Sequence, residues 1–251
     1  MDMDINTTFC HFLFPTACIY IGSTRGLKEY TIKEKGKEAQ TEKPSTLAIF
    51  LDAMKVPVLC TLALVTIYFS LKHELTILQN LLKAYVLFLG WVTIHQHMLE
   101  FFRNTFQFME FHDHPQPWLL GCSRLELGIL VFTAYLIYVY LATRHWFINN
   151  YIAMSVCVYA IEKWQQTRML QVFVIFAGLM LYDVSFVFGT DVMMTVATGF
   201  ESPMKILFPT KGKQLSMIGI GDVIVPGLLS SMCLRADFIT SMVYKVRQQA
   251  T

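Results

Sequence analysis

Charged side chains are scarce in this sequence. Only 15% of its 251 residues are Asp, Glu, Lys or Arg, while 55% are hydrophobic, and the mean hydropathy is +0.47. Ordinary soluble domains carry roughly 25% charged residues, so this chain has too little polar surface to face water on every side. The composition excludes an ordinary soluble domain. Because the apolar residues come in blocks, it favours an integral membrane protein.

Other classes of function lack support as well. A net charge of +2 is too small to indicate a nucleic-acid partner. The six cysteines include no Cys-x-x-Cys pair and lie in or beside apolar blocks, where a free thiol behaves as a small hydrophobic group. His95 and His97 are spaced i, i+2, which turns the two rings to different faces of a helix and favours a polar membrane edge over a metal site. We expect no disulfide, no metal and no cofactor.

Seven apolar segments are candidates for membrane-spanning helices. A bilayer core of about 30 Å needs roughly 20 apolar residues in a helix, and the first and fifth segments are shorter than the others. The segments are 9–23, 53–71, 81–98, 125–142, 147–161, 169–188 and 216–234. The first is an uncleaved anchor or the apolar part of a cleaved signal peptide, and the acidic start Met1-Asp2-Met3-Asp4 favours the anchor. The sequence thus predicts one all-α polytopic domain over residues 1–251.

Lysine and arginine are unevenly distributed along these segments. If residues 25–43 lie in the cytosol, 13 of the 20 basic residues fall on the cytosolic side and 5 on the other. Because basic residues favour the cytosolic side, we expect a lumenal N-terminus, a cytosolic C-terminus and a charged cytosolic linker over residues 24–52. The triplet Asn6-Thr7-Thr8 is then a lumenal N-glycosylation sequon.

Two aspartates lie inside apolar segments. Asp183 follows Tyr182 in the sixth segment, and Asp222 follows Gly219-Ile220-Gly221 in the seventh. An ionisable group at the middle of a membrane helix costs about 2.5 to 3.5 kcal/mol, which indicates function, although a single such residue could also join two helices by hydrogen bonding. Each Asp lies six residues from the expected lumenal end of its segment, or about 9 Å. Antiparallel neighbouring spans would therefore hold the two carboxylates at one depth.

Two carboxylates in close contact share a proton, because both cannot ionise cheaply. The ionised one can accept a proton from water while the protonated one polarises a peptide carbonyl, and which residue has which role stays open. Gly219 and Gly221 would let a substrate backbone approach closely, or would serve close helix packing. The residues predict aspartyl proteolysis inside the bilayer, with 169–234 as the catalytic pair of spans and the lumenal loop between them.

These motifs resemble those of the signal peptide peptidase family, which is related to the presenilins. Tyr182-Asp183 is similar to the family's YD motif and Gly219-Ile220-Gly221-Asp222 to its GxGD motif, and the likeness is strong over residues 144–237. The resemblance implies an endoplasmic-reticulum membrane enzyme that cleaves signal-peptide remnants and type II membrane segments. Asp183 and Asp222 would be catalytic, with Tyr182, Gly219 and Gly221 shaping the site. The implied partners are transmembrane peptides and the lipid bilayer, and assembly into a homo-oligomer stays open.

The end of the sequence departs from the family's pattern. The family has nine spans, with a Pro-Ala-Leu motif in the ninth, whereas this sequence ends at Thr251 and contains no Pro-Ala-Leu. A truncated product, an incomplete gene model or a reduced protein would each give this pattern, so the resemblance supports the fold more strongly than the activity. Two alternatives to a protease stay open. One is a non-catalytic relative that binds membrane helices, and the other is a seven-span transporter or receptor.

Overall fold

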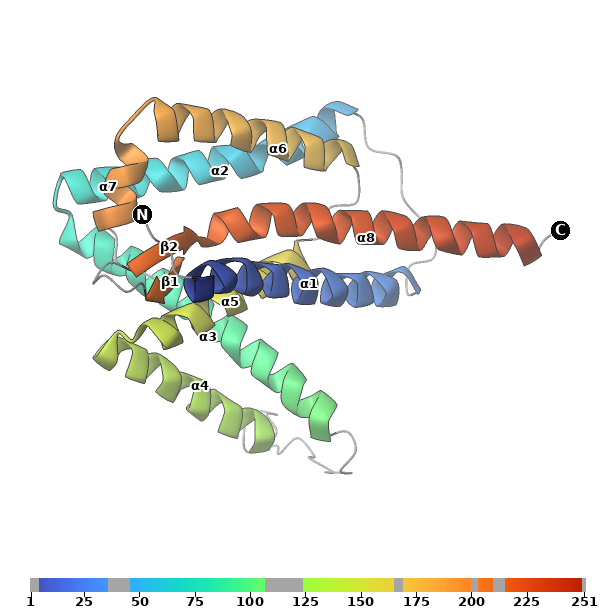
Figure 1. Cartoon of the computed structure of the whole chain (residues 1–251), viewed down its shortest axis with the longest axis horizontal. Coiled ribbons are helices and arrows are strands. Elements are labelled where there is room, and N and C mark those ends of the chain that lie inside the picture. The colour runs from blue at the N-terminus through green and yellow to red at the C-terminus, as the bar shows by residue number, and fades with distance from the viewer. Residues whose placement is uncertain are drawn as a thin grey trace. The chain divides into compact units, whose positions relative to one another are not determined.

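The computed structural model describes residues 5–35, 46–106, 124–164, 169–199, 203–209 and 215–249. Most of these residues are helical, and one short hairpin follows the seventh α-helix (Figure 1). The elements are α1 (Ile5–Lys35), α2 (Thr46–Lys72), α3 (Thr76–Phe106), α4 (Arg124–Thr143), α5 (Trp146–Lys163), α6 (Met169–Asp183), the π-helix η2 (Val184–Phe188), α7 (Val192–Gly199), β1 (Lys205–Pro209), β2 (Leu215–Gly219) and α8 (Ile220–Gln249). The prediction of an all-α membrane bundle is confirmed, and the hairpin is an addition to it.

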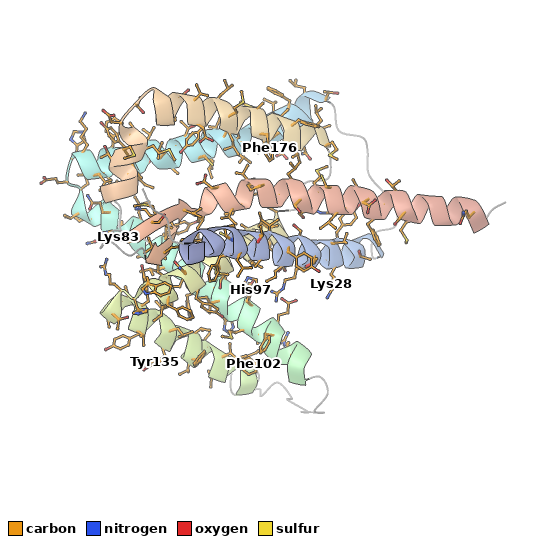
Figure 2. All side chains as sticks on the ribbon, in the orientation of Figure 1. Lys28, Lys83, His97, Phe102, Tyr135 and Phe176 are labelled. Atoms are coloured by element: carbon orange, nitrogen blue, oxygen red, sulfur yellow. The ribbon has the colours of Figure 1, made fainter. Side chains whose placement is uncertain are left out.

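A helix is present in each of the seven predicted segments. Within the described residues, five helices are long and apolar enough to cross a membrane: Thr46–Lys72, Thr76–Arg103, Glu126–Thr143, Met169–Phe186 and Ile220–Met242. Their outward side chains are largely apolar, as with Tyr135 on α4, which is 60% exposed (Figure 2). The helices α1 and α5, which contain the two shorter predicted segments, are outside this set of five. Seven crossings therefore stays a prediction.

One predicted boundary needs correction, and the predicted linker has helical ends. The seventh span is predicted to begin at residue 216, but Leu215–Gly219 forms β2 and the helix begins at Ile220. Pairing of this short apolar run with β1 replaces helical hydrogen bonds with a strand ladder. The interval 24–52, predicted as a charged linker, is helical at both ends, because α1 continues to Lys35 and α2 begins at Thr46. Lysine and glutamate are good helix formers, which explains the extension of α1.

The chain divides into two compact units. The first comprises Met1–Phe12, Ala84–Val156 and Ser202–Ile220, and the second comprises Leu13–Lys83, Cys157–Glu201 and Gly221–Thr251. The helices α1, α3, α5 and α8 each contribute residues to both units, α8 with Ile220 in the first and the rest in the second.

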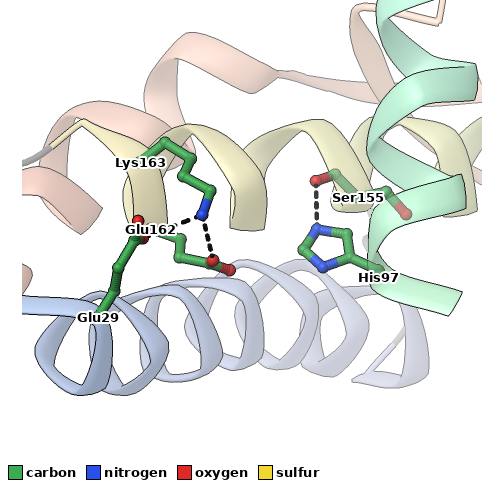
Figure 3. Close-up of polar contacts among 5 residues, drawn as sticks. All are labelled: Glu29, His97, Ser155, Glu162 and Lys163. Carbon is green, nitrogen blue, oxygen red and sulfur yellow. Dashed lines mark hydrogen bonds and ion pairs between the residues drawn. The ribbon is translucent and has the colours of Figure 1, made fainter. Parts of the chain in front are cut away.

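The core of the first unit is formed by α3, α4 and α5. Ile94, Tyr140 and Ile152 are buried together there. The close approach of α3 to α5 requires a glycine at position 90, because a Cβ atom on Gly90 would lie 2.5 Å from Cγ2 of Ile152. The ring nitrogen Nε2 of His97 lies 3.1 Å from the carbonyl oxygen of Ser155, which adds a polar link between the same two helices (Figure 3).

In the second unit, α1 packs against the end of α5 and against α8. A Cβ atom on Gly22 would lie 2.8 Å from Cβ of Ile161, and one on Gly227 would lie 2.3 Å from Cδ1 of the same side chain. Figure 3 shows Lys163 between two carboxylates, with distances of 3.1 Å to Glu29 and 3.3 Å to Glu162. Burial lowers the pKa of Lys163, but the hydrogen bond to Glu29 and the charge of Glu162 outweigh it, and the pKa is raised overall. Lys163 therefore keeps its positive charge at neutral pH.

The helices α2 and α6 of the second unit pack closely around one glycine and one proline. A Cβ atom on Gly178 would lie 2.4 Å from Cγ of Pro57, and small residues are the usual means of close helix packing in membranes. Nearer the start of both helices, Gln171 donates a hydrogen bond of 3.4 Å to the Asp52 carboxylate. These two contacts set the register of α6, and hence the level at which it ends, relative to α2.

We predict that Gly178→Ala destabilises the folded protein by about 1 to 3 kcal/mol, because the new methyl group overlaps the rigid proline ring. Thermal unfolding of the purified protein in detergent micelles would show this as a lower Tm. The matched control is Gly128→Ala in α4, where no described atom outside that stretch of helix backbone lies within 4 Å of an added Cβ atom. That change removes a helix-interior glycine, which favours the helix by roughly 1 kcal/mol. Equal Tm values for the two variants would contradict the contact with Pro57.

Candidate active site

The Tyr182-Asp183 pair lies where α6 changes from an α-helix to a π-helix. Asp183 is the last residue of α6, with φ −62° and ψ −47°, and η2 begins at the next residue. π-helical turns are rare and occur frequently at functional sites. The segment ends at Gly189, where a Cβ atom would lie 2.5 Å from the carbonyl oxygen of Ser185. A glycine is therefore needed at the end of the π turn, and the turn leaves the Asp183 side chain exposed.

A groove with a volume of about 460 Å³ lies between α2 and the end of α6. It is lined by Met54, Pro57, Val58, Thr61, Leu62, Val65, Gly178, Leu181, Tyr182, Ser185 and Phe186. The ring of Tyr182 lies 5.1 Å from that of Phe186, centre to centre, so the two aromatic rings form one wall. The predicted role of Tyr182 in shaping the site agrees with this position, although its function stays a prediction.

The GxGD residues lie at the junction between β2 and α8. Gly219 is the last residue of β2 and pairs with Lys205 of β1. Ile220 begins α8 and donates a backbone hydrogen bond of 3.2 Å to the carbonyl oxygen of Met204, which ties the start of the helix to the hairpin. Gly221 follows in the helix, and apart from its neighbours and the backbone of its own helix no atom of the described residues lies within 4 Å of an added Cβ atom, so open space lies beside it. The Asp222 side chain, in the first turn of α8, is exposed.

The predicted depth of Asp222 is corrected by this junction. The residue is the third of α8 rather than the seventh of a span starting at residue 216, so it lies about 3 Å along the helix instead of about 9 Å. Both aspartates belong to the second unit. There α6 ends and α8 begins at the same end of the two helices, which run in opposite directions (Figure 1). This placement agrees with the antiparallel arrangement, and the pairing of the carboxylates stays a prediction.

The hairpin before Asp222 is held by two asparagines of α5. The side-chain amide of Asn150 donates to the carbonyl oxygen of Leu207 and accepts from the N–H group of the same residue, both at 2.7 Å. Asn149 donates to the carbonyl oxygen of Lys205, also at 2.7 Å. Both asparagines are buried. The Asn149 oxygen accepts a hydrogen bond of 3.2 Å from the hydroxyl group of Tyr140.

These two asparagines bind along one edge of β1. Residues 205 and 207 alternate with residues that face β2, so their backbone groups point away from the hairpin partner. Asn150 supplies to Leu207 the donor and acceptor that a third strand would supply. An unpaired buried backbone group costs about 1 to 3 kcal/mol. These contacts avoid that cost at Lys205 and Leu207. Neither residue has a role predicted from the sequence, where the pair is part of the stretch that resembles the family's connection into the fifth span and stands out as two amides in an otherwise apolar segment.

Asn6, the predicted glycosylation site, is the second residue of α1. Its side chain is outside the described part of the structure, and its modification stays a prediction.

Comparison with known proteins decides the family. A family model described as signal peptide peptidase matches residues 40–247, which is most of the chain. The chain belongs to the signal peptide peptidase family. The recognition made from the YD and GxGD motifs is thereby confirmed.

Individual relatives agree with this family. The human signal peptide peptidase is 27% identical over 240 residues, which cover 87% of this chain and 62% of the human protein. A probable intramembrane protease of Saccharomyces cerevisiae is 32% identical over 121 residues, covering 46% of this chain and 21% of the yeast protein. Intramembrane protease 2 of Caenorhabditis elegans is 31% identical over 124 residues, covering 46% and 26%. The chain thus spans less than two thirds of the length of these relatives. No solved structure gives a significant match.

The two glycines beside the candidate aspartates should differ in their tolerance of alanine. We predict that Gly221→Ala leaves the Tm of this family member unchanged or slightly raised, because the space beside it is open. Gly189→Ala should lower stability by about 1 to 3 kcal/mol, since its methyl group would meet a backbone carbonyl that cannot rotate away. Thermal unfolding in detergent micelles checks both variants. A fully tolerated Gly189→Ala would contradict the π-helical turn after Asp183.

Proposed function

We propose that this chain is an intramembrane aspartic endopeptidase in which Asp183 and Asp222 act as a pair. Membership of the signal peptide peptidase family supports a protease. The observation that carries the assignment to these two residues is their placement. Each lies in an apolar helix, where a carboxylate is expensive. Each is exposed where regular helix gives way to another backbone form, and both belong to one unit.

The reaction is peptide hydrolysis by acid–base catalysis. One carboxylate accepts a proton from a water molecule while the water oxygen bonds to the scissile carbonyl carbon. The other carboxyl group donates a hydrogen bond, and then its proton, to the carbonyl oxygen, giving a neutral tetrahedral intermediate. That intermediate returns a proton to the second carboxylate, and the first carboxyl group protonates the leaving nitrogen as the C–N bond breaks. The pair thus ends with one proton, as it began, and the roles of the two residues are not distinguished.

A transmembrane substrate must unwind at the bond that is cleaved, because a helical peptide group is enclosed by its own hydrogen bonds. The hairpin offers backbone groups that can replace those bonds. One edge of β1 is taken by asparagines and the other by β2, so among the described strand edges we propose the outer edge of β2 as the place where an extended peptide pairs. That edge leads through Gly219 to the open space at Gly221. This is the role that we propose for the two glycines.

Signal-peptide remnants and type II membrane segments, in the endoplasmic-reticulum membrane, are the substrates that we propose. The deciding experiment measures cleavage of a type II signal-peptide reporter by the purified chain in lipid nanodiscs. Asp183→Ala and Asp222→Ala should each lose at least a thousandfold in kcat and keep the parent's Tm, since both side chains are exposed. Product from either variant would exclude the pair. Bound but uncleaved reporter with every protein would instead support a non-catalytic relative that binds membrane helices.

The proposed orientation has a separate test. We expect an added N-glycosylation acceptor before Met1 to be modified in microsomes and the same acceptor after Thr251 to remain unmodified, because the basic residues favour a cytosolic C-terminus. Glycan removal and gel mobility give the readout. Modification of the C-terminal acceptor would overturn the orientation without affecting the aspartate pair.

A further inference from the structure

The hairpin before Asp222 is held by hydrogen bonds on both edges of β1. Within the first unit, β1 has a partner on each side, namely β2 on one edge and side chains of α5 on the other. The three amide contacts are each 2.7 Å long, and both asparagines are at most 5% exposed. Their replacement by water is therefore obstructed. Buried amides with this many backbone contacts act as fixed parts of a structure rather than as a solvated surface.

The two hydrogen bonds of Asn150 explain why this position needs an asparagine. A primary amide has an oxygen that accepts and a nitrogen that donates, and here both meet the N–H and C=O groups of Leu207. Aspartate keeps the acceptor and loses the donor, whereas alanine loses both. Asn149 makes its contact two residues earlier on the same edge, at Lys205, and is itself oriented by Tyr140. The edge is thus held at two points along the strand.

The hairpin in turn holds the start of α8. Lys205 pairs with Gly219, and the backbone N–H group of Ile220 donates to Met204 immediately beyond that pair. Asp222 follows Ile220 by two residues in the same helical turn. We infer that Asn149 and Asn150 are positioning residues that hold the first turn of α8, and with it the Asp222 carboxylate, through β1 and β2. The consequence for catalysis rests on the proposed function, whereas the consequence for the backbone does not.

Hydrogen–deuterium exchange of the intact protein in nanodiscs tests the inference. Asn150→Ala should speed exchange of peptides covering residues 205–209 and 216–224 at least tenfold, with Asn150→Asp intermediate because one of its two contacts remains. Asn149→Ala should act in the same direction. The matched control is Ser155→Ala, also buried on α5, whose hydroxyl donates a hydrogen bond to Tyr151 of the same helix. In the Ser155→Ala variant, residues 205–209 and 216–224 should exchange at the parent's rate. Parent-like exchange at residues 216–224 in Asn150→Asp and Asn149→Ala would overturn the inference.

Kinetics with the type II reporter separates positioning from general stability. For Asn150→Asp we expect kcat to fall at least tenfold, a larger change than in KM, because displacement of Asp222 acts on the chemical step while the β2 edge that the reporter pairs with is loosened but still present. A normal kcat despite faster exchange would overturn the positioning role. If the parent cleaves nothing, the proposed function fails, yet the exchange data still decide whether the asparagines hold the start of α8.

Discussion

Satisfaction of backbone hydrogen bonds is the constraint on which the rest of this structure depends. In a bilayer, irregular backbone is tolerated only where other parts of the protein, or water in a cavity, supply the missing partners. Most of the described chain meets this requirement as helix. The hairpin meets it differently, through the ladder between β1 and β2 and through Asn149 and Asn150 on the outer edge of β1. The buried side-chain amides of α5 thus supply hydrogen-bond partners to β1 that a strand without a second neighbour would lack.

The candidate aspartates both lie at interruptions of regular helix. A π-helical turn follows Asp183, and a strand ends three residues before Asp222. A carboxylate at the middle of an uninterrupted apolar helix would be surrounded by lipid or packed side chains, where its charged form is costly. At both interruptions the aspartate side chain is exposed. The same irregularity would meet the chemical need of the proposed hydrolysis, which consumes one water molecule per bond.

Several features of the fold and site follow from local residue patterns, and others do not. The long apolar blocks predict the helices well, because a membrane span is recognised by length and hydropathy alone. The YD and GxGD motifs are short and contiguous, so the family can be read from them directly. By contrast, Leu215–Gly219 was predicted as helix because a short apolar run has no periodicity that separates strand from helix. The contribution of Asn149 and Asn150 depends on a strand more than fifty residues away, and no local pattern reveals such a partner.

By itself, the sequence determined that this is a helical membrane protein of the signal peptide peptidase family with two acidic residues in apolar surroundings. These properties depend on composition and on neighbouring residues, which are visible along one chain. Only the tertiary structure decided where α8 begins, how α6 ends, and which side chains hold the hairpin. Those outcomes depend on competition between helical and inter-strand hydrogen bonds, and on close contacts such as that of Gly178 with Pro57. Their energies come from groups that meet only when the chain is folded.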